Sequence, residues 1–152
     1  MSIARKYLDK RAGTIQAVKD YSSMDFIIRN TGSEIKRAYD GLTGVGSPGM
    51  DGLPHAHDPK AGEERLAGGL DEIDVLKERY RQAVEYMAWF VPAWEELSED
   101  EQFVLETFYE GSGYSDTNPV DTICEAFQIE RSSAYNRKNR AVNHLTTLLF
   151  GK

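Results

Sequence analysis

The chain has 152 residues, with 25 acidic and 18 basic side chains and a formal net charge of −7. This length suggests one domain, or a small domain with an appendage. No run of residues is as long and apolar as a membrane span, and the first residues lack the apolar core of a signal peptide. The single cysteine, Cys124, excludes an internal disulfide and a cysteine-based zinc site. These features predict a soluble, cytoplasmic protein without membrane contact.

The charge is distributed unevenly along the chain. Residues 1–43 have a net charge of +3, residues 44–130 of −15 and residues 131–152 of +5. The last segment contains no acidic residue. Such a basic block is expected of an element that binds phosphate. Cations at a helix C-terminus are also favoured by the helix dipole, so charge alone leaves both interpretations open.

Apolar residues recur mostly at helical spacing and strand signals are nearly absent, so the sequence predicts an all-α fold. We expect a first helix over about residues 2–30 and a stop at residues 30–32. A short helix would follow over residues 34–39, with Ser33 as its N-cap. Residues 1–40 therefore form the predicted N-terminal helical segment.

A linker is predicted over residues 41–62, because this stretch is rich in glycine and proline. His55, His57 and Asp58 lie within it. A metal site would need further ligands and a rigid scaffold, so we predict a polar linker and no metal site.

A long helix is predicted over residues 63–97, and Pro92 should kink or end it. The aromatic residues near Pro92 are expected to lie in the core. Apolar residues recur along this helix at steps of three and four, as is typical of a seam that packs against another helix. The seam comprises Leu70, Ile73, Leu76, Tyr80, Val84, Met87, Val91 and Trp94. Its partner is either a helix of the same chain or a second copy, and we expect self-association.

The remaining residues, 98–152, are predicted to form a helix-turn-helix domain. Ser98 and Glu101 have the spacing of a capping box, which starts a helix that glycines end at about residue 111. One of residues 116–118 should cap the next helix, with Pro119 in its first turn.

A short connection leads to a last helix, capped by Ser132 or Ser133 and running to about Leu149. Its apolar residues share one face, and the opposite face has the side chains that proteins use to contact DNA. Arginine can bind guanine with two hydrogen bonds, asparagine can bind adenine, and serine can bind phosphate or a base edge. The candidate DNA-binding residues are Arg131, Ser132, Ser133, Asn136, Arg137, Lys138 and Arg140.

Residues 98–109, 120–127 and 132–142 resemble the DNA-binding region 4 of bacterial sigma factors. The whole chain is similar to phage regulators of late transcription of the ArpU/RinA type. Those proteins have an N-terminal helical part, a Gly/Pro-rich stretch that ends in Asp-Pro (here Asp58-Pro59), a long helix and a sigma-like end. One departure is residues 111–118, which are longer than the tight turn usual in sigma region 4.

The resemblance implies a prophage-encoded activator of the packaging and structural genes, acting in the cytoplasm of a bacterial host. By position, it also implies DNA contacts from Ser132, Ser133, Asn136, Arg137 and Arg140.

The expected partners are double-stranded DNA and a second copy of the chain, with host RNA polymerase as a further candidate. We expect no cofactor and no enzymatic activity, because no phosphate-binding loop, nucleophile elbow or zinc-protease motif occurs. Two alternatives remain open. One is a small terminase subunit that recognises packaging DNA, and the other is a sigma-like adaptor that binds only protein, such as RNA polymerase.

Overall fold

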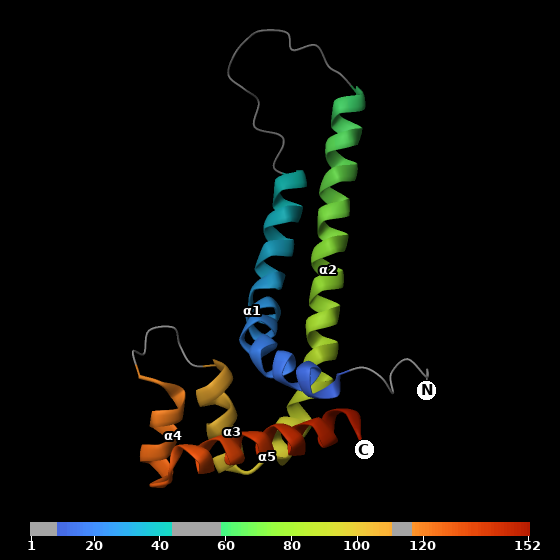
Figure 1. Ribbon diagram of the computed structural model, residues 1–152. Coiled ribbons are helices and arrows are strands. Elements are labelled where there is room, and N and C mark those ends of the chain that lie inside the picture. The colour runs from blue at the N-terminus through green and yellow to red at the C-terminus, as the bar shows by residue number, and fades with distance from the viewer. Residues whose placement is uncertain (1–8, 44–58, 111–116) are drawn as a thin grey trace. The chain divides into compact units, whose positions relative to one another are not determined.

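A computed structural model of the chain describes residues 9–43, 59–110 and 117–152 (Figure 1). Regular secondary structure in these ranges is entirely helical, which confirms the predicted all-α class. The elements are α1 (Lys10–Thr43), α2 (Pro59–Glu96), α3 (Glu99–Leu105), the π-helical turn η2 (Glu106–Glu110), α4 (Pro119–Phe127) and α5 (Arg131–Phe150). In the described ranges, no helix combines the length and the apolar character needed to cross a membrane.

The chain divides into two compact units. Unit 1 comprises Met1–Ser22 and Tyr86–Lys152, and unit 2 comprises Ser23–Glu85. Both boundaries fall inside helices, so α1 and α2 each contribute residues to both units.

The larger apolar core of unit 1 combines the first turns of α1, the last turns of α2, and parts of α3 and α5. Its buried members are Ala17, Val18, Phe90, Ala93, Leu97, Leu105, Ala141, Val142 and Leu145. The Tyr86 hydroxyl donates a hydrogen bond to the Ala17 carbonyl oxygen, which joins α2 to α1 within this unit. The core therefore depends on segments that are far apart in the sequence.

A second buried cluster connects α3, α4 and α5, and it consists of Val104, Val120, Ile123 and Ala134. Cys124 and Ile129 are half-buried and pack against it. Figure 1 shows α3 and α4 next to the first half of α5. This cluster fixes the position of the basic helix within unit 1.

Both predicted caps of the short helices are confirmed. Ser98 and Glu101 form a reciprocal capping box at the start of α3. The Asn118 side chain accepts a hydrogen bond from the Val120 N–H at 3.0 Å, and Pro119 occupies the first turn of α4. These side chains satisfy backbone donors that lack a partner within the helix, so the sequence specifies both starts locally.

The predicted helix stop at residues 30–32 is wrong, because α1 is continuous from Lys10 to Thr43. The Asn30 amide donates to the Phe26 carbonyl oxygen at 2.8 Å, and the Thr31 hydroxyl donates to the Ile27 carbonyl oxygen at 2.6 Å. Asparagine and threonine side chains often end a helix. In α1 those of Asn30 and Thr31 instead bond to the preceding helical turn, which is compatible with an uninterrupted helix.

The predicted linker is narrower than 41–62 at both ends, since α1 ends at Thr43 and α2 begins at Pro59. Residues 44–58, including His55, His57 and Asp58, lie outside the described residues. Pro92 does not end the long helix, because α2 continues to Glu96.

The last helix starts earlier than predicted. Its N-cap is Glu130, whose side chain makes no capping hydrogen bond, and α5 begins at Arg131. Neither Ser132 nor Ser133 is the cap. Gln128 ends α4 in the left-handed conformation, with φ 54° and ψ 51°, and turns the chain within three residues. Because Ile129 then packs on the second cluster, the chain returns to helical geometry before the serines.

The seam residues of α2 have different environments. Ile73 and Leu76 are buried, Met87, Val91 and Trp94 are half-buried, and Leu70, Tyr80 and Val84 are 43%, 41% and 42% exposed. Phe90, predicted only as part of an aromatic core cluster, is 1% exposed. The seam therefore combines core positions with apolar side chains that face solvent in the isolated chain.

Two adjacent glycines of unit 2 have opposite environments. A Cβ on Gly69 would collide with the Leu42 side chain of α1, whereas a Cβ on Gly68 would meet no atom within 4 Å. We expect Gly68→Ala to raise the free energy of unfolding by about 1 kcal/mol, because alanine is the better helix former. Gly69→Ala must displace Leu42, and overpacking costs about 1–3 kcal/mol, so it should offset or exceed that gain.

Urea unfolding of both variants, followed by far-UV circular dichroism, checks this prediction. Equal stabilisation by the two substitutions would show that Gly69 is not a point of close helix contact.

Candidate nucleic-acid interface

Helix α5 is held in unit 1 by one apolar face. Ala134, Ala141, Val142 and Leu145 are buried on that face. Ser132, Asn136 and Arg140 are exposed on the other side of the helix. With Arg131, which is also exposed, four of the seven candidate residues are therefore presented to solvent on a helix whose orientation within unit 1 is fixed by packing.

Arg137 and Arg140 are cations without an acidic partner, since neither forms an ion pair with any residue in the described ranges. The Arg137 guanidinium carbon lies 4.3 Å from the centroid of the Phe127 ring on α4. A guanidinium stacked on a ring keeps its planar N–H donors available at the edge. The Arg140 Nε donates to the Asn136 carbonyl oxygen at 3.5 Å, a long hydrogen bond within α5.

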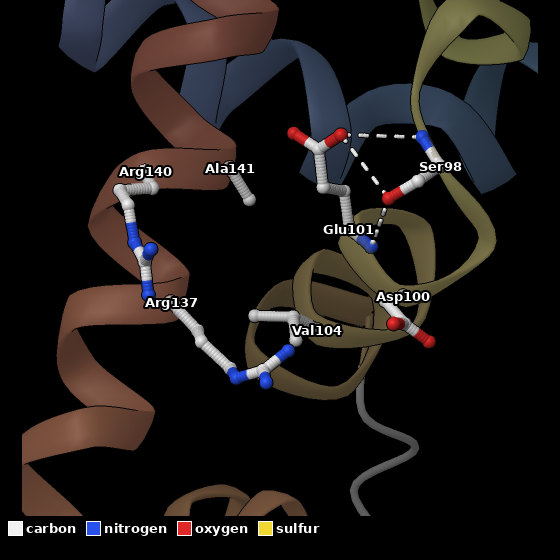
Figure 2. Close-up of a pocket in the computed structure, with 7 residues that line it drawn as sticks. All are labelled: Ser98, Asp100, Glu101, Val104, Arg137, Arg140 and Ala141. Atoms are coloured by element: carbon white, nitrogen blue, oxygen red, sulfur yellow. Dashed lines mark hydrogen bonds between the residues drawn. The ribbon is translucent and has the colours of Figure 1, made fainter. Parts of the chain in front are cut away.

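A pocket of about 340 Å³ lies between α5 and the start of α3. Figure 2 shows Arg137 and Arg140 on the α5 side, with Ser98, Asp100 and Glu101 on the other. Val104 and Ala141 complete the lining. The two guanidinium groups thus face a space large enough for an incoming polar group, and carboxylates on the far wall limit how much negative charge can enter.

Two of the other candidate residues, Arg131 and Lys138, have partners within the protein. Arg131 forms an ion pair with Asp121 of α4, with 3.2 Å between Nη1 and Oδ1. The Lys138 ammonium lies 5.2 Å from the Phe108 ring centroid and 5.4 Å from that of Tyr135. Both Lys138 and Ser133 are half-buried. Lys138, predicted among the DNA-binding residues, therefore lies toward the packed side of α5.

Sequence reasoning missed three residues on this surface: Arg11, Asn139 and Asn143. Arg11 Nη2 donates to Asn139 Oδ1 at 2.7 Å, and Arg11 Nη1 donates to Asn143 Oδ1 at 3.0 Å. The asparagines could have been found from their spacing, because they follow Asn136 at positions i+3 and i+7 on one face. Arg11 gives no such signal, because it belongs to a different helix.

Glu101 joins α3 to α5 as well as capping α3. Its Oε2 lies 2.7 Å from Nδ1 of His144 on α5, and its Oε1 accepts from the Ser98 backbone N–H at 3.2 Å. Burial by itself raises the pKa of Glu101, but hydrogen bonds from His144 and Ser98 outweigh it and leave the pKa below its ordinary value of 4.5.

This lowered pKa has a consequence for stability. A carboxylate with a lowered folded-state pKa stabilises the fold above its unfolded value, and the contribution is lost as the pH falls through the folded value. We expect wild-type stability to decrease as the pH falls below about 4.5, the ordinary value. Glu101→Gln should show a shallower decrease in that window. At neutral pH it should be less stable by about 1 kcal/mol, because neutral hydrogen bonds are weaker than charged ones.

Denaturant unfolding between pH 3 and pH 7 (roughly the range over which carboxyl groups titrate) measures this difference. Glu99→Gln is the matched control, since Glu99 is an exposed carboxylate in the same helical turn. Identical pH profiles of stability for Glu101→Gln and wild type would contradict the lowered pKa of Glu101.

Among the described residues, no group of three or more His, Cys, Asp or Glu side chains could hold a metal ion. Comparisons of the chain with family models, with curated proteins and with solved structures found no match. The function is therefore inferred from the arrangement of this chain's own residues.

Proposed function

We propose that the protein is a sequence-specific, double-stranded-DNA-binding regulator of transcription, and an activator of late phage packaging and structural genes. The observation that carries the proposal is a pair of cations on α5, Arg137 and Arg140, which have no acidic partner among the described residues. They belong to an acid-free segment of a chain with a net charge of −7. Cations that are not neutralised within the protein are available to an external polyanion.

The packing of α3, α4 and α5 supports a helix-turn-helix mode of binding. Only residues 128–130 separate α4 from α5, and both helices contact the same buried cluster. In this mode the second helix enters the major groove and its N-terminal residues contact the bases. Asn136 and Arg140 are exposed and of the types that bind adenine and guanine edges, and exposed Ser132 suits a phosphate.

Self-association of the regulator is part of the proposal. One helix-turn-helix module buries only about 600–1,000 Å² on DNA, so a second copy would add a second half-site. The exposed apolar residues Leu70, Tyr80 and Val84 of α2 provide a candidate surface for that copy. RNA polymerase is the further partner that an activator requires.

The test is selection from a random pool of duplex DNA, followed by titration of the selected site at several salt concentrations. We expect one enriched motif and an affinity that falls with salt by about 0.9 log unit per phosphate contact for each log unit of salt. Mass measurement of the complex then separates a dimer from the ring of a small terminase subunit. No binding to any duplex at low salt would refute the proposal and favour the protein-only adaptor.

A further inference from the structure

Arg11 is held on the exposed face of α5 although it belongs to α1. Its two terminal nitrogens donate to Asn139 and Asn143, which lie four residues apart on α5. Arg11 and Asn143 are exposed, and Asn139 is half-buried. Because Asn136 lies on the same helical face, the Arg11 guanidinium belongs to the surface that we propose for DNA contact.

The partners of Arg11 hold the guanidinium without neutralising it. Both acceptors are neutral amide oxygens, and no ion pair of Arg11 occurs among the described residues. The nearby carboxylate of Asp9 accepts a hydrogen bond from the Ala12 backbone N–H at 3.0 Å, at the start of α1. A guanidinium has five N–H donors, so Arg11 retains donors and its full charge for an external anion.

The point along α5 at which the Arg11 guanidinium is held indicates which part of DNA it would meet. Asn139 lies eight residues after the first residue of α5, which is about 12 Å along the helix axis. The major groove is also about 12 Å wide. A helix that enters the groove by its N-terminal residues therefore brings the backbone of Asn139 and Asn143 to about the level of the sugar-phosphate backbone, and only a side chain as long as that of Arg140 reaches back from there to a base edge.

We infer that Arg11 binds a DNA backbone phosphate at the edge of the groove entered by α5, with Asn139 and Asn143 as its positioning residues. This inference rests on the proposed DNA-binding function. It extends the DNA-contacting surface from the helix-turn-helix to the first turn of α1. The contact is independent of base sequence, because phosphates are present at every step of the duplex.

The experiment measures the affinity of full-length variants for the selected duplex and for a scrambled duplex of the same length, at several salt concentrations. Arg11→Gln should weaken binding to both duplexes by the same factor, about tenfold at low salt, and should reduce the salt slope by about 0.9. Arg11→Lys should retain the slope, since it keeps the charge. Arg29→Gln is the matched control, because Arg29 is an exposed arginine of α1 in unit 2, ion-paired with Asp25.

A double variant, Asn139→Ala with Asn143→Ala, removes the positioning residues and keeps the Arg11 charge. We expect it to weaken binding a few-fold, with the slope retained. Melting temperatures of all variants identify any that fail to fold. If Arg11→Gln fails to fold, Arg11→Lys and the double variant decide whether Arg11 binds phosphate.

The outcomes separate this inference from the proposed function. If the wild type binds no duplex, the proposed function fails and the phosphate contact fails with it. If the wild type binds but Arg11→Gln has the same affinity and slope, the inference is overturned and the proposed function stands. Tighter binding by Arg11→Gln would also overturn it, because Arg11 would then be shielding the asparagines. A lower melting temperature with unchanged DNA binding would make the contact purely structural.

Discussion

Replacing Phe90 with alanine is expected to lower the free energy of unfolding by about 3–5 kcal/mol. The Phe90 side chain is 1% exposed and belongs to the larger core of unit 1. Its ring stacks on Tyr86 with centroids 5.2 Å apart, stacks on Trp94 at 5.6 Å and lies tilted to Tyr21 at 5.9 Å. Alanine would lose these contacts and leave a cavity between the rings of Tyr21, Tyr86 and Trp94.

Urea unfolding followed by tryptophan fluorescence measures the loss. Val75→Ala on the same helix is the control, since Val75 is 66% exposed and its truncation should change stability by less than about 0.5 kcal/mol. A loss below about 1 kcal/mol in Phe90→Ala would mean that the aromatic cluster does not organise unit 1.

The largest effect on DNA binding is expected for Arg140→Ala. We expect this variant to bind the selected site about 1–3 kcal/mol less tightly, a change of roughly 5- to 150-fold, and to lose discrimination at one base position. Arg140 is exposed and forms no ion pair with any residue in the described ranges. Arg137→Ala should weaken binding too, but it also removes the contact with the Phe127 ring, so its effect combines binding with local packing.

A charge-matched control distinguishes base recognition from a general loss of positive charge. Arg81 lies in unit 2 and is ion-paired with Glu78 and Glu85, so Arg81→Ala changes the net charge equally without altering α5. Binding titrations with the selected site and with single-base variants provide the comparison. If Arg140→Ala and Arg81→Ala behave alike, or if base preference is unchanged, Arg140 does not contact a base.

Features determined by a few neighbouring residues were predicted well from the sequence. The Ser98–Glu101 capping box, the Asn118 cap with Pro119 and the apolar face of α5 all depend on interactions within one or two helical turns. The errors occurred where a residue had two local options. Asn30 and Thr31 could either end a helix or bond to the carbonyl oxygens of the preceding turn. The packing of α1, in which Thr31 is buried, favours the bonds to the preceding turn.

The candidate interface was predictable only in part, for a similar reason. The residue types and helical spacing on α5 place Asn136 and Arg140 opposite the apolar face, and both are exposed. Lys138 could not be placed, since its contact with Phe108 depends on how η2 packs against α5. The bonds from Arg11 join residues 128 and 132 positions apart, a distance over which local patterns carry no information.

The core of unit 1 also sets the order in which a newly made chain can fold. Val18 and Phe90 are buried together with Val142 and Leu145 of α5, so this core cannot close before α5 has left the ribosome. Until then the apolar surfaces of this core stay open to aggregation or chaperone binding. Because α5 both completes the core and bears the proposed DNA-contacting side chains, a partly synthesised chain would lack the core and the proposed DNA-contacting surface together.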